Sequence, residues 1–331
     1  MAENENNAKP SIDDKYGKLD KDLILLLKNY EYEYFRLNKP IPFCGLLIYP
    51  IPVKYYEEFA NCCSCLTLNK NEDPQGIRYS HLDYLVNKMK IEENAEGKLW
   101  SQKLQRLFEL IFRINNGVKC TNTDCNHVIT YDGEELRNYI QTYNDAYKKA
   151  QEDGGKFTPP QLKCPKCGGT EFSEMIKIVP DPKTQKNAFM VDGHLITRDD
   201  WVKLRQIVLY QNYPDYVDDS WVDPAVRKDH EEKLRLQQQK QDLHASIEKK
   251  VTCLVAATNY KFDELYEMSI RRFTMLLSTV DDLINYKIMK QAVMSGFVTL
   301  PKGQTIEHWI WKPIKDIYGD SYKDKDDVQE L

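Results

Sequence analysis

Glycine and long apolar runs are both scarce in this sequence. Glycine accounts for 14 of the 331 residues, whereas tyrosine reaches 21. Little glycine, together with many leucines, lysines and glutamates, favours helices over a fold of tightly turned strands. No run approaches the roughly 20 apolar residues that a membrane helix needs, and the polar start of the chain lacks the apolar core of a signal peptide. We therefore expect a soluble, cytosolic protein without a membrane partner.

Recognisable catalytic motifs are also missing. The segment 154–158 lacks the GK[ST] order of a phosphate-binding loop, and no G-x-S-x-G elbow occurs. His230 has no second histidine four residues later, which excludes the metalloprotease helix motif. The six histidines are scattered along the chain, outside any nucleophile or base pattern. The sequence therefore predicts a protein that is not an enzyme.

The charge pattern gives no reason to expect nucleic acid as a partner. The formal net charge is −5, and lysines and arginines alternate with acidic residues along most of the chain. A protein that binds nucleic acid through phosphate contacts usually carries a basic stripe or face, and none is visible here.

Four of the nine cysteines have the spacing of metal ligands. Cys120 and Cys125 are separated by four residues, Cys164 and Cys167 by two, and 38 residues lie between the pairs. Two short cysteine knuckles of this kind supply the tetrahedral thiolate set of structural zinc sites. The glycine that follows Cys167 allows the backbone to turn back toward the metal. We therefore predict a zinc-ribbon-like module in which these four cysteines bind Zn²⁺.

Two other interpretations of these cysteines remain open. The four thiols could be free or buried without a metal, although their polar, loop-like surroundings are unusual for buried cysteines. His127 could also replace one of the cysteines as a ligand. A site closed by four thiolates has no open coordination position, so a zinc ion there is expected to stabilise the fold rather than activate water.

The remaining cysteines and the aromatic residues are better explained by packing. Cys62 and Cys63 fall on the apolar side of a helix predicted at 53–66, where unpaired cysteines behave as small apolar residues. Trp309 and Trp311 would share one side of a final strand. Core packing is the simpler explanation for these tryptophans, and an aromatic contact with a partner is the alternative.

The predicted fold is mainly α, α+β overall, with helical N- and C-terminal domains, an inserted zinc-ribbon-like module and a C-terminal β-hairpin. Apolar spacing predicts one continuous helix at 262–295, and Thr197 with Asp200 forms a helix-start signal. The expected parts are a disordered arm at 1–18, an N-terminal helical domain at 19–116, the cysteine module at 117–180, a helix with an extended aromatic linker at 181–224, a helical domain with a hairpin at 225–318, and a loose tail at 319–331.

Five segments of the chain carry a resemblance to known proteins: CGLLIYPIPVKYYEEF (44–59), CLTLNKNEDPQGIRYSHLDYL (65–85), IVLYQNYPDYVDDSWVDP (207–224), YEMSIRRFTMLLSTVDDLINYKIMKQAVMSGFVTL (266–300) and IEHWIWK (306–312). These segments resemble tail-region assembly proteins of large tailed bacteriophages. The resemblance implies a non-catalytic role in tail or baseplate morphogenesis, either as an assembly chaperone for the tape-measure protein or as a baseplate component. It implies other tail, baseplate or tape-measure proteins as partners, in the host cytoplasm during assembly or in the virion tail.

A zinc-ribbon factor associated with nucleic acid, in transcription or replication, is the alternative function. Residues 117–179 contain eight Lys or Arg and nine Asp or Glu, which is close to neutral. Phosphate contacts require clustered cations that release counterions, so the composition of the module favours the first hypothesis.

Overall fold

The computed structural model describes two compact units, each assembled from separate stretches of the chain. Unit 1 comprises Met1–Ile41, Pro50–Arg78 and Lys203–Leu331, and unit 2 comprises Pro42–Tyr49 and Tyr79–Val202. Within them the structure describes residues 21–68, 70, 76–90, 95–122, 124–152, 157–213, 245–296, 299, 306 and 308. The predicted arm at 1–18, the tail at 319–331 and most of the predicted linker and hairpin lie outside these residues.

Unit 1 is helical in the part that the structure describes. A π-helical turn, η1, directly continues its first helix, and a 3-10 turn, η2, leads into α3. Helix α7 (Arg198–Asn212) contributes its residues from Lys203 onward. The other elements are α2 (Lys21–Tyr30), η1 (Glu31–Phe35), η2 (Val53–Tyr55), α3 (Tyr56–Thr67), α9 (Ile247–Ala257), α10 (Phe262–Glu267) and α11 (Ile270–Met294).

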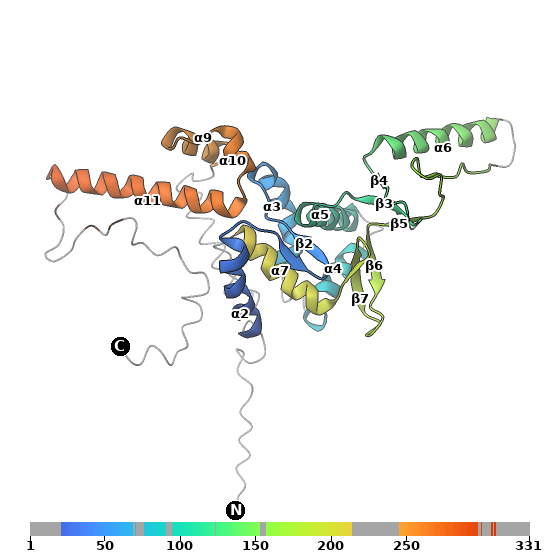
Figure 1. The fold of residues 1–331 in the computed structure, drawn as a ribbon, viewed down its shortest axis with the longest axis horizontal. Helices are drawn as coiled ribbons and strands as arrows, with labels where there is room; N and C mark the ends of the chain where they lie inside the picture. Colours follow the sequence, from blue (N-terminus) through green and yellow to red (C-terminus); the bar gives the residue numbers. More distant parts are fainter. Residues whose placement is uncertain are drawn as a thin grey trace, which may run out of the picture. The chain divides into compact units, whose positions relative to one another are not determined.

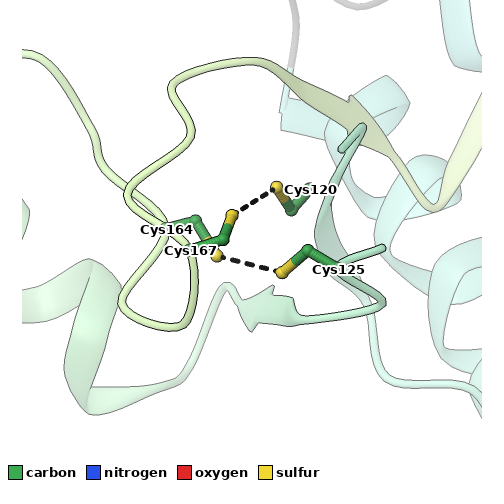
Figure 2. Close-up of side chains that lie close together, drawn as sticks. All are labelled: Cys120, Cys125, Cys164 and Cys167. Carbon is green, nitrogen blue, oxygen red and sulfur yellow. Dashed lines mark hydrogen bonds between the residues drawn. The ribbon is translucent and has the colours of Figure 1, made fainter. Parts of the chain in front are cut away.

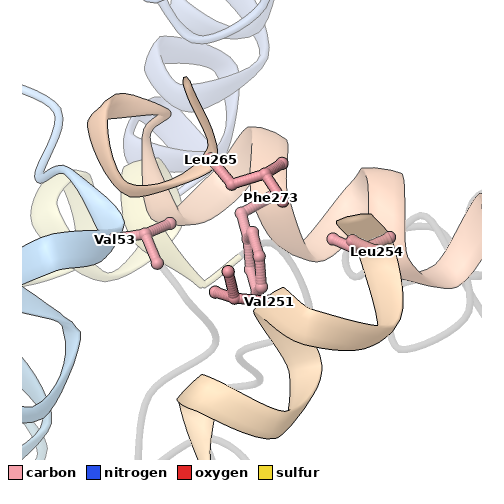
Figure 3. Close-up of a cluster of buried hydrophobic side chains, with 5 residues drawn as sticks. All are labelled: Val53, Val251, Leu254, Leu265 and Phe273. Atoms are coloured by element: carbon pink, nitrogen blue, oxygen red, sulfur yellow. The ribbon is translucent and has the colours of Figure 1, made fainter. Parts of the chain in front are cut away.

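A buried apolar cluster holds the three C-terminal helices of unit 1 together. Phe273 of α11 lies among side chains from α9, α10 and η2, as Figure 3 shows. Its members are at most 2% exposed, so each contributes most of its apolar surface to the core. The cluster consists of Val53, Val251, Leu254, Leu265 and Phe273.

The prediction of one continuous helix at 262–295 is wrong near its start, where the chain forms two helices separated by a short extended segment. The backbone is extended at Met268 and Ser269, so α10 ends at Glu267 and α11 begins at Ile270. The extended residues pair with a distant segment: Val53 N donates to Met268 O over 2.8 Å, and Ile270 N donates to Ile51 O over 2.9 Å. This pairing satisfies backbone groups that a continuous helix would have used internally.

A buried arginine joins three parts of unit 1. Arg271 donates from Nη2 to both carboxylate oxygens of Glu31, over 2.9 and 2.8 Å, and from Nη1 to Tyr210 O over 2.7 Å. Its guanidinium also lies 5.3 Å from the ring centroid of Phe35. A bidentate carboxylate and an aromatic face are the partners that a guanidinium prefers when it is withdrawn from water.

The cysteines of α3 lie largely in the apolar interior, as predicted for Cys62. Cys62 and Cys65 are buried, at 3% and 1% exposure. Cys63 is half-buried, and burial together with the neighbouring Cys62 raises the pKa of its thiol to about 12, against the lowering effect of Arg205. A thiol with so high a pKa remains protonated at neutral pH and is a poor nucleophile.

In the part that the structure describes, unit 2 combines three complete helices with three small sheets. Helices α4 and α5 pack on each other, and α4 also contacts strand β7 (Figure 1). The sheets have the strand orders β1-β2, β4-β3-β5 and β6-β7-β8. The elements are β1 (Ile41–Phe43), β2 (Leu46–Ile48), α4 (His81–Lys90), α5 (Ala95–Phe112), β3 (Gly117–Cys120), β4 (Val128–Thr130), α6 (Glu134–Glu152), β5 (Phe172–Glu174), β6 (Ile176–Pro180), β7 (Asn187–Val191) and β8 (His194–Ile196).

Three aromatic rings form the centre of unit 2. The ring of Trp201 lies 5.3 Å from that of Phe189 and 6.1 Å from that of Phe108, between centroids, and the rings meet edge to face. All three side chains are fully buried. The predicted helix start is confirmed nearby, since Thr197 Oγ1 donates to Asp200 Oδ2 over 2.6 Å and the backbone N–H of Thr197 donates to the same oxygen over 3.1 Å.

A buried carboxylate ties α4 to the β6-β7-β8 sheet. Asp83 accepts hydrogen bonds from Ser80 Oγ over 2.7 Å and from Asn187 Nδ2 over 2.8 Å, and it pairs with Arg198. Burial raises the pKa of Asp83, but these hydrogen bonds and the arginine charge outweigh it, so the pKa lies below its usual range. The ionised carboxylate is therefore part of the folded state.

The described residues are mainly helical with small antiparallel sheets, in agreement with the predicted fold class at that level. No helix among them is both long enough and apolar enough to cross a membrane.

Candidate metal centre

The four cysteines of the predicted module lie around one end of the β4-β3-β5 sheet. Strand β3 pairs antiparallel with both neighbours and ends at Cys120, which is opposite Phe172 of β5. Cys125 follows in the turn between β3 and β4, and Cys164 and Cys167 precede β5. The ends of β3 and β5 therefore bring the two cysteine pairs together.

Backbone hydrogen bonds fix the first knuckle. Cys125 N donates to Asn122 O over 2.9 Å and closes a turn. Cys120 N donates to His127 O over 3.0 Å, which continues the β3–β4 pairing past the end of the regular strand. These two hydrogen bonds hold the backbone at Cys120 and Cys125, whose sulfurs both belong to the four-sulfur group.

The second knuckle depends on two glycines. Gly168 N donates to Cys164 O, and Cys164 N donates to Gly169 O, both over 2.8 Å. Gly168 has a φ of 71°, a conformation that glycine adopts without strain. A side chain at Gly169 would lie 3.3 Å from Cys167 Sγ and 3.4 Å from Cys120 Sγ. Glycine is therefore needed at 168 for the turn and at 169 for close approach to the sulfurs.

The sulfur positions fit a tetrahedral metal ion. All four Sγ atoms lie within 4.8 Å of one another, and Cys120–Cys167 and Cys125–Cys164 are in contact at 3.5 Å (Figure 2). These distances exceed the roughly 2.05 Å of a disulfide bond. A tetrahedral ion with metal–sulfur bonds of about 2.3 Å requires sulfur atoms about 3.8 Å apart. The four thiols therefore lie close enough together to hold one ion.

The four thiols differ in exposure and acidity. Cys120, Cys125 and Cys164 are buried, whereas Cys167 is exposed. The backbone N–H of Gly169, 3.4 Å from Cys167 Sγ, lowers the pKa of that thiol to about 7. At Cys125 the backbone N–H of His127 lowers the pKa, but burial and the neighbouring thiols raise it to about 12. A bound cation would remove this difference, because metal binding deprotonates every ligating thiol.

His127, the alternative ligand, is engaged elsewhere. Its Nε2 lies 3.0 Å from a carboxylate oxygen of Glu135 at the start of α6, and the group of atoms that could share an ion consists of the four cysteine sulfurs. Phe172, which sequence reasoning did not single out, packs against the buried cysteines and covers them on one side. Its role depends on its register opposite Cys120, which the local sequence does not reveal.

Helix α6 and the segment after it explain the long spacing between the knuckles. The 19-residue helix has no buried residue, so it lies outside the core. The returning segment runs back along it: Phe157 meets the rings of Tyr143 and Tyr147 at 5.2 and 5.3 Å, and Tyr139 Oη donates to Pro160 O over 3.0 Å. The chain therefore leaves after β4 and returns to place Cys164 beside Cys125.

Comparison with known proteins gives one match, in the C-terminal part of the chain. Residues 237–312 match the family described as the YomV second domain. This domain family comes from phage proteins. The match covers less than half of the chain and includes α9, α10 and α11 of unit 1. No curated protein and no solved structure matches the chain.

Proposed function

We propose that this chain is a phage protein that acts without catalysis in tail or baseplate assembly, through contacts with other tail, baseplate or tape-measure proteins. The observation that carries the proposal is the match of residues 237–312 to a phage-derived domain. The tail-region resemblance of segments on both sides of the cysteine module supports the same role. The protein would act in the host cytoplasm during assembly or in the tail of the virion.

In this proposal the four cysteines hold a structural zinc ion. The donor set of four sulfurs favours zinc over calcium, magnesium or manganese, which prefer oxygen ligands. Four thiolates complete the tetrahedron, and the metal would contribute folding free energy. The surroundings agree with this role: the cysteines join the ends of β3 and β5 in a segment whose inserted helix has no buried residue.

The experiment for the assembly role is affinity capture of the tagged full-length chain from cells in which the phage is assembling. The expected result is recovery of a tape-measure or baseplate protein. In the phage genome, we expect the gene for this chain to lie beside the genes for those proteins. Capture that yields no tail protein from assembling cells would contradict the proposal.

The nucleic-acid alternative has its own readout. Binding through phosphate contacts should weaken steeply as salt increases, because each contact releases counterions. We expect no salt-dependent shift of DNA or RNA by the metal-loaded protein. A shift at moderate ionic strength that disappears at high salt would favour the alternative and would count against the assembly role.

A further inference from the structure

Two sulfur contacts at the metal centre cross between the knuckles. Cys120 Sγ of the first knuckle touches Cys167 Sγ of the second, and Cys125 Sγ touches Cys164 Sγ, each at 3.5 Å (Figure 2). Zinc holds such sulfurs apart without changing its own oxidation state. If the thiolates were oxidised, the sulfurs in contact would be the ones placed to join.

We infer that the four-cysteine centre is a redox-responsive site, in which a hydroperoxide releases the metal and leaves two disulfides that link the knuckles, Cys120–Cys167 and Cys125–Cys164. This inference rests on the proposed zinc site. Oxidation would replace the bound metal, which links the two knuckles, with two disulfide bonds that link them instead.

The exposed thiol determines where the chemistry starts. Cys167 is the one member of the group that is exposed, whereas the other three are buried. Its thiolate attacks one oxygen of the peroxide, the O–O bond breaks, hydroxide leaves, and sulfur is oxidised to sulfenic acid. The Cys120 thiolate, in contact with that sulfur, then displaces a second hydroxide and forms the disulfide.

The second pair follows by the same chemistry. A zinc ion that has lost two of its four thiolates is held only by Cys125 and Cys164 and dissociates as Zn²⁺. A second peroxide then joins these two sulfurs, which are already in contact. In total, four thiolates and two molecules of hydrogen peroxide give two disulfides and four hydroxide ions.

The crossed pairing would preserve the sheet, whereas pairing within a knuckle would not. A disulfide between Cys120 and Cys167 joins the end of β3 to the segment that precedes β5. It therefore links the same two chain segments that the Cys120–Phe172 strand pairing brings together. Disulfides within each knuckle would leave the two halves unconnected after the metal has gone. The inference therefore includes retained pairing of β3 and β5 in the oxidised, metal-free protein.

The test is disulfide mapping of the zinc-loaded full-length chain after treatment with hydrogen peroxide. Released zinc is followed with a chromophoric chelator, remaining thiols are blocked, and the protein is digested without reduction. Trypsin cuts after Lys163 and Lys166 and separates Cys164 from Cys167, and cleavage before Asp124 separates Cys120 from Cys125. Each of the possible pairings therefore gives a peptide pair of distinct mass.

The expected result is zinc release that rises with the two crossed peptide pairs, with protection retained at the amides that link the β3 and β5 segments, Thr121 N to Glu171 O and Met175 N to Gly117 O. Cys253→Ser should leave the rate of zinc release unchanged, because Cys253 lies outside the four-sulfur group. Linked peptides within a knuckle, sulfinic acids without linkage, or loss of this amide protection would each overturn the inference. If the purified wild-type chain holds no zinc, the zinc proposal itself fails.

Discussion

Replacing the buried arginine of unit 1 should destabilise that unit far more than replacing its neighbour. Arg271 is 9% exposed in its side chain, and Glu31, its partner, is 22% exposed. The change to test is Arg271→Met, which keeps an unbranched apolar stem and removes the guanidinium. It removes the guanidinium hydrogen bonds to the Glu31 carboxylate and to the Tyr210 carbonyl, and it leaves Arg36 Nε, 3.4 Å from Glu31 Oε1, as the cation beside Glu31.

The expected cost follows from these lost contacts. Breaking a fully buried ion pair on one side costs about 3–5 kcal/mol, and a carbonyl left without a donor costs roughly 1–3 kcal/mol. Water can reach Glu31 in part, which reduces the first contribution. We therefore expect the free energy of unfolding of unit 1 to fall by about 3 kcal/mol.

The matched control is Arg272→Met, at the next position of the same helix. Arg272 is exposed and donates to Arg36 O over 3.2 Å, so its replacement should cost less than about 1 kcal/mol. Adding Glu31→Gln to Arg271→Met should cost less than the sum of the single changes, because the two residues contact each other.

Hydrogen exchange of the α2 and α11 amides is the suitable assay, since a chain with two units need not unfold in one step. A loss of protection in Arg271→Met no larger than that in Arg272→Met would refute the reasoning. Additive effects of the Glu31 and Arg271 changes would also refute it, because they would mean that the pair contributes nothing as a pair.

Three further predictions concern the apolar cluster, the buried carboxylate and the metal centre. Phe273→Ala should lower the stability of unit 1 by about 3–5 kcal/mol in denaturant unfolding, because it empties a packed site. The pKa of Asp83 is lower in the folded chain than in the unfolded chain, where it is about 3.9. The ionised carboxylate therefore stabilises the fold above that pH, and this stabilisation is lost as the pH falls through the lower pKa of the folded state. Asp83→Asn should therefore flatten the acid part of the stability profile, and an unchanged profile would contradict this. Cys164→Ser should lose the metal and increase hydrogen exchange over 117–179, whereas Cys253→Ser should keep both unchanged.

Local signals in the sequence were sufficient to locate many helices and one helix start. The Thr197–Asp200 pair acts as predicted because its hydrogen bonds span only three residues. The break at Met268–Ser269 could not be predicted in the same way. It depends on pairing with residues 51–53, more than two hundred positions earlier, and apolar spacing continues across it.

The cysteine group shows the same division between local and distant information. Spacing was enough to select the four residues whose sulfurs lie together. The close approach of Gly169 to two sulfurs and the cover provided by Phe172 depend on strand register, which short strands do not fix by sequence alone. Strands β7 and β8 were not predicted for a related reason, since their five and three residues are too few for alternation to identify them.

The metal content of the purified protein shows directly whether the four cysteines bind a zinc ion. The full-length chain would be expressed without added metal, desalted, and analysed by elemental mass spectrometry and by native mass spectrometry of the intact protein. We expect about one zinc per chain, bound by the four thiols, and faster alkylation of the three buried ones, Cys120, Cys125 and Cys164, after chelation. A wild-type protein with no metal, or with iron in place of zinc, would contradict this expectation.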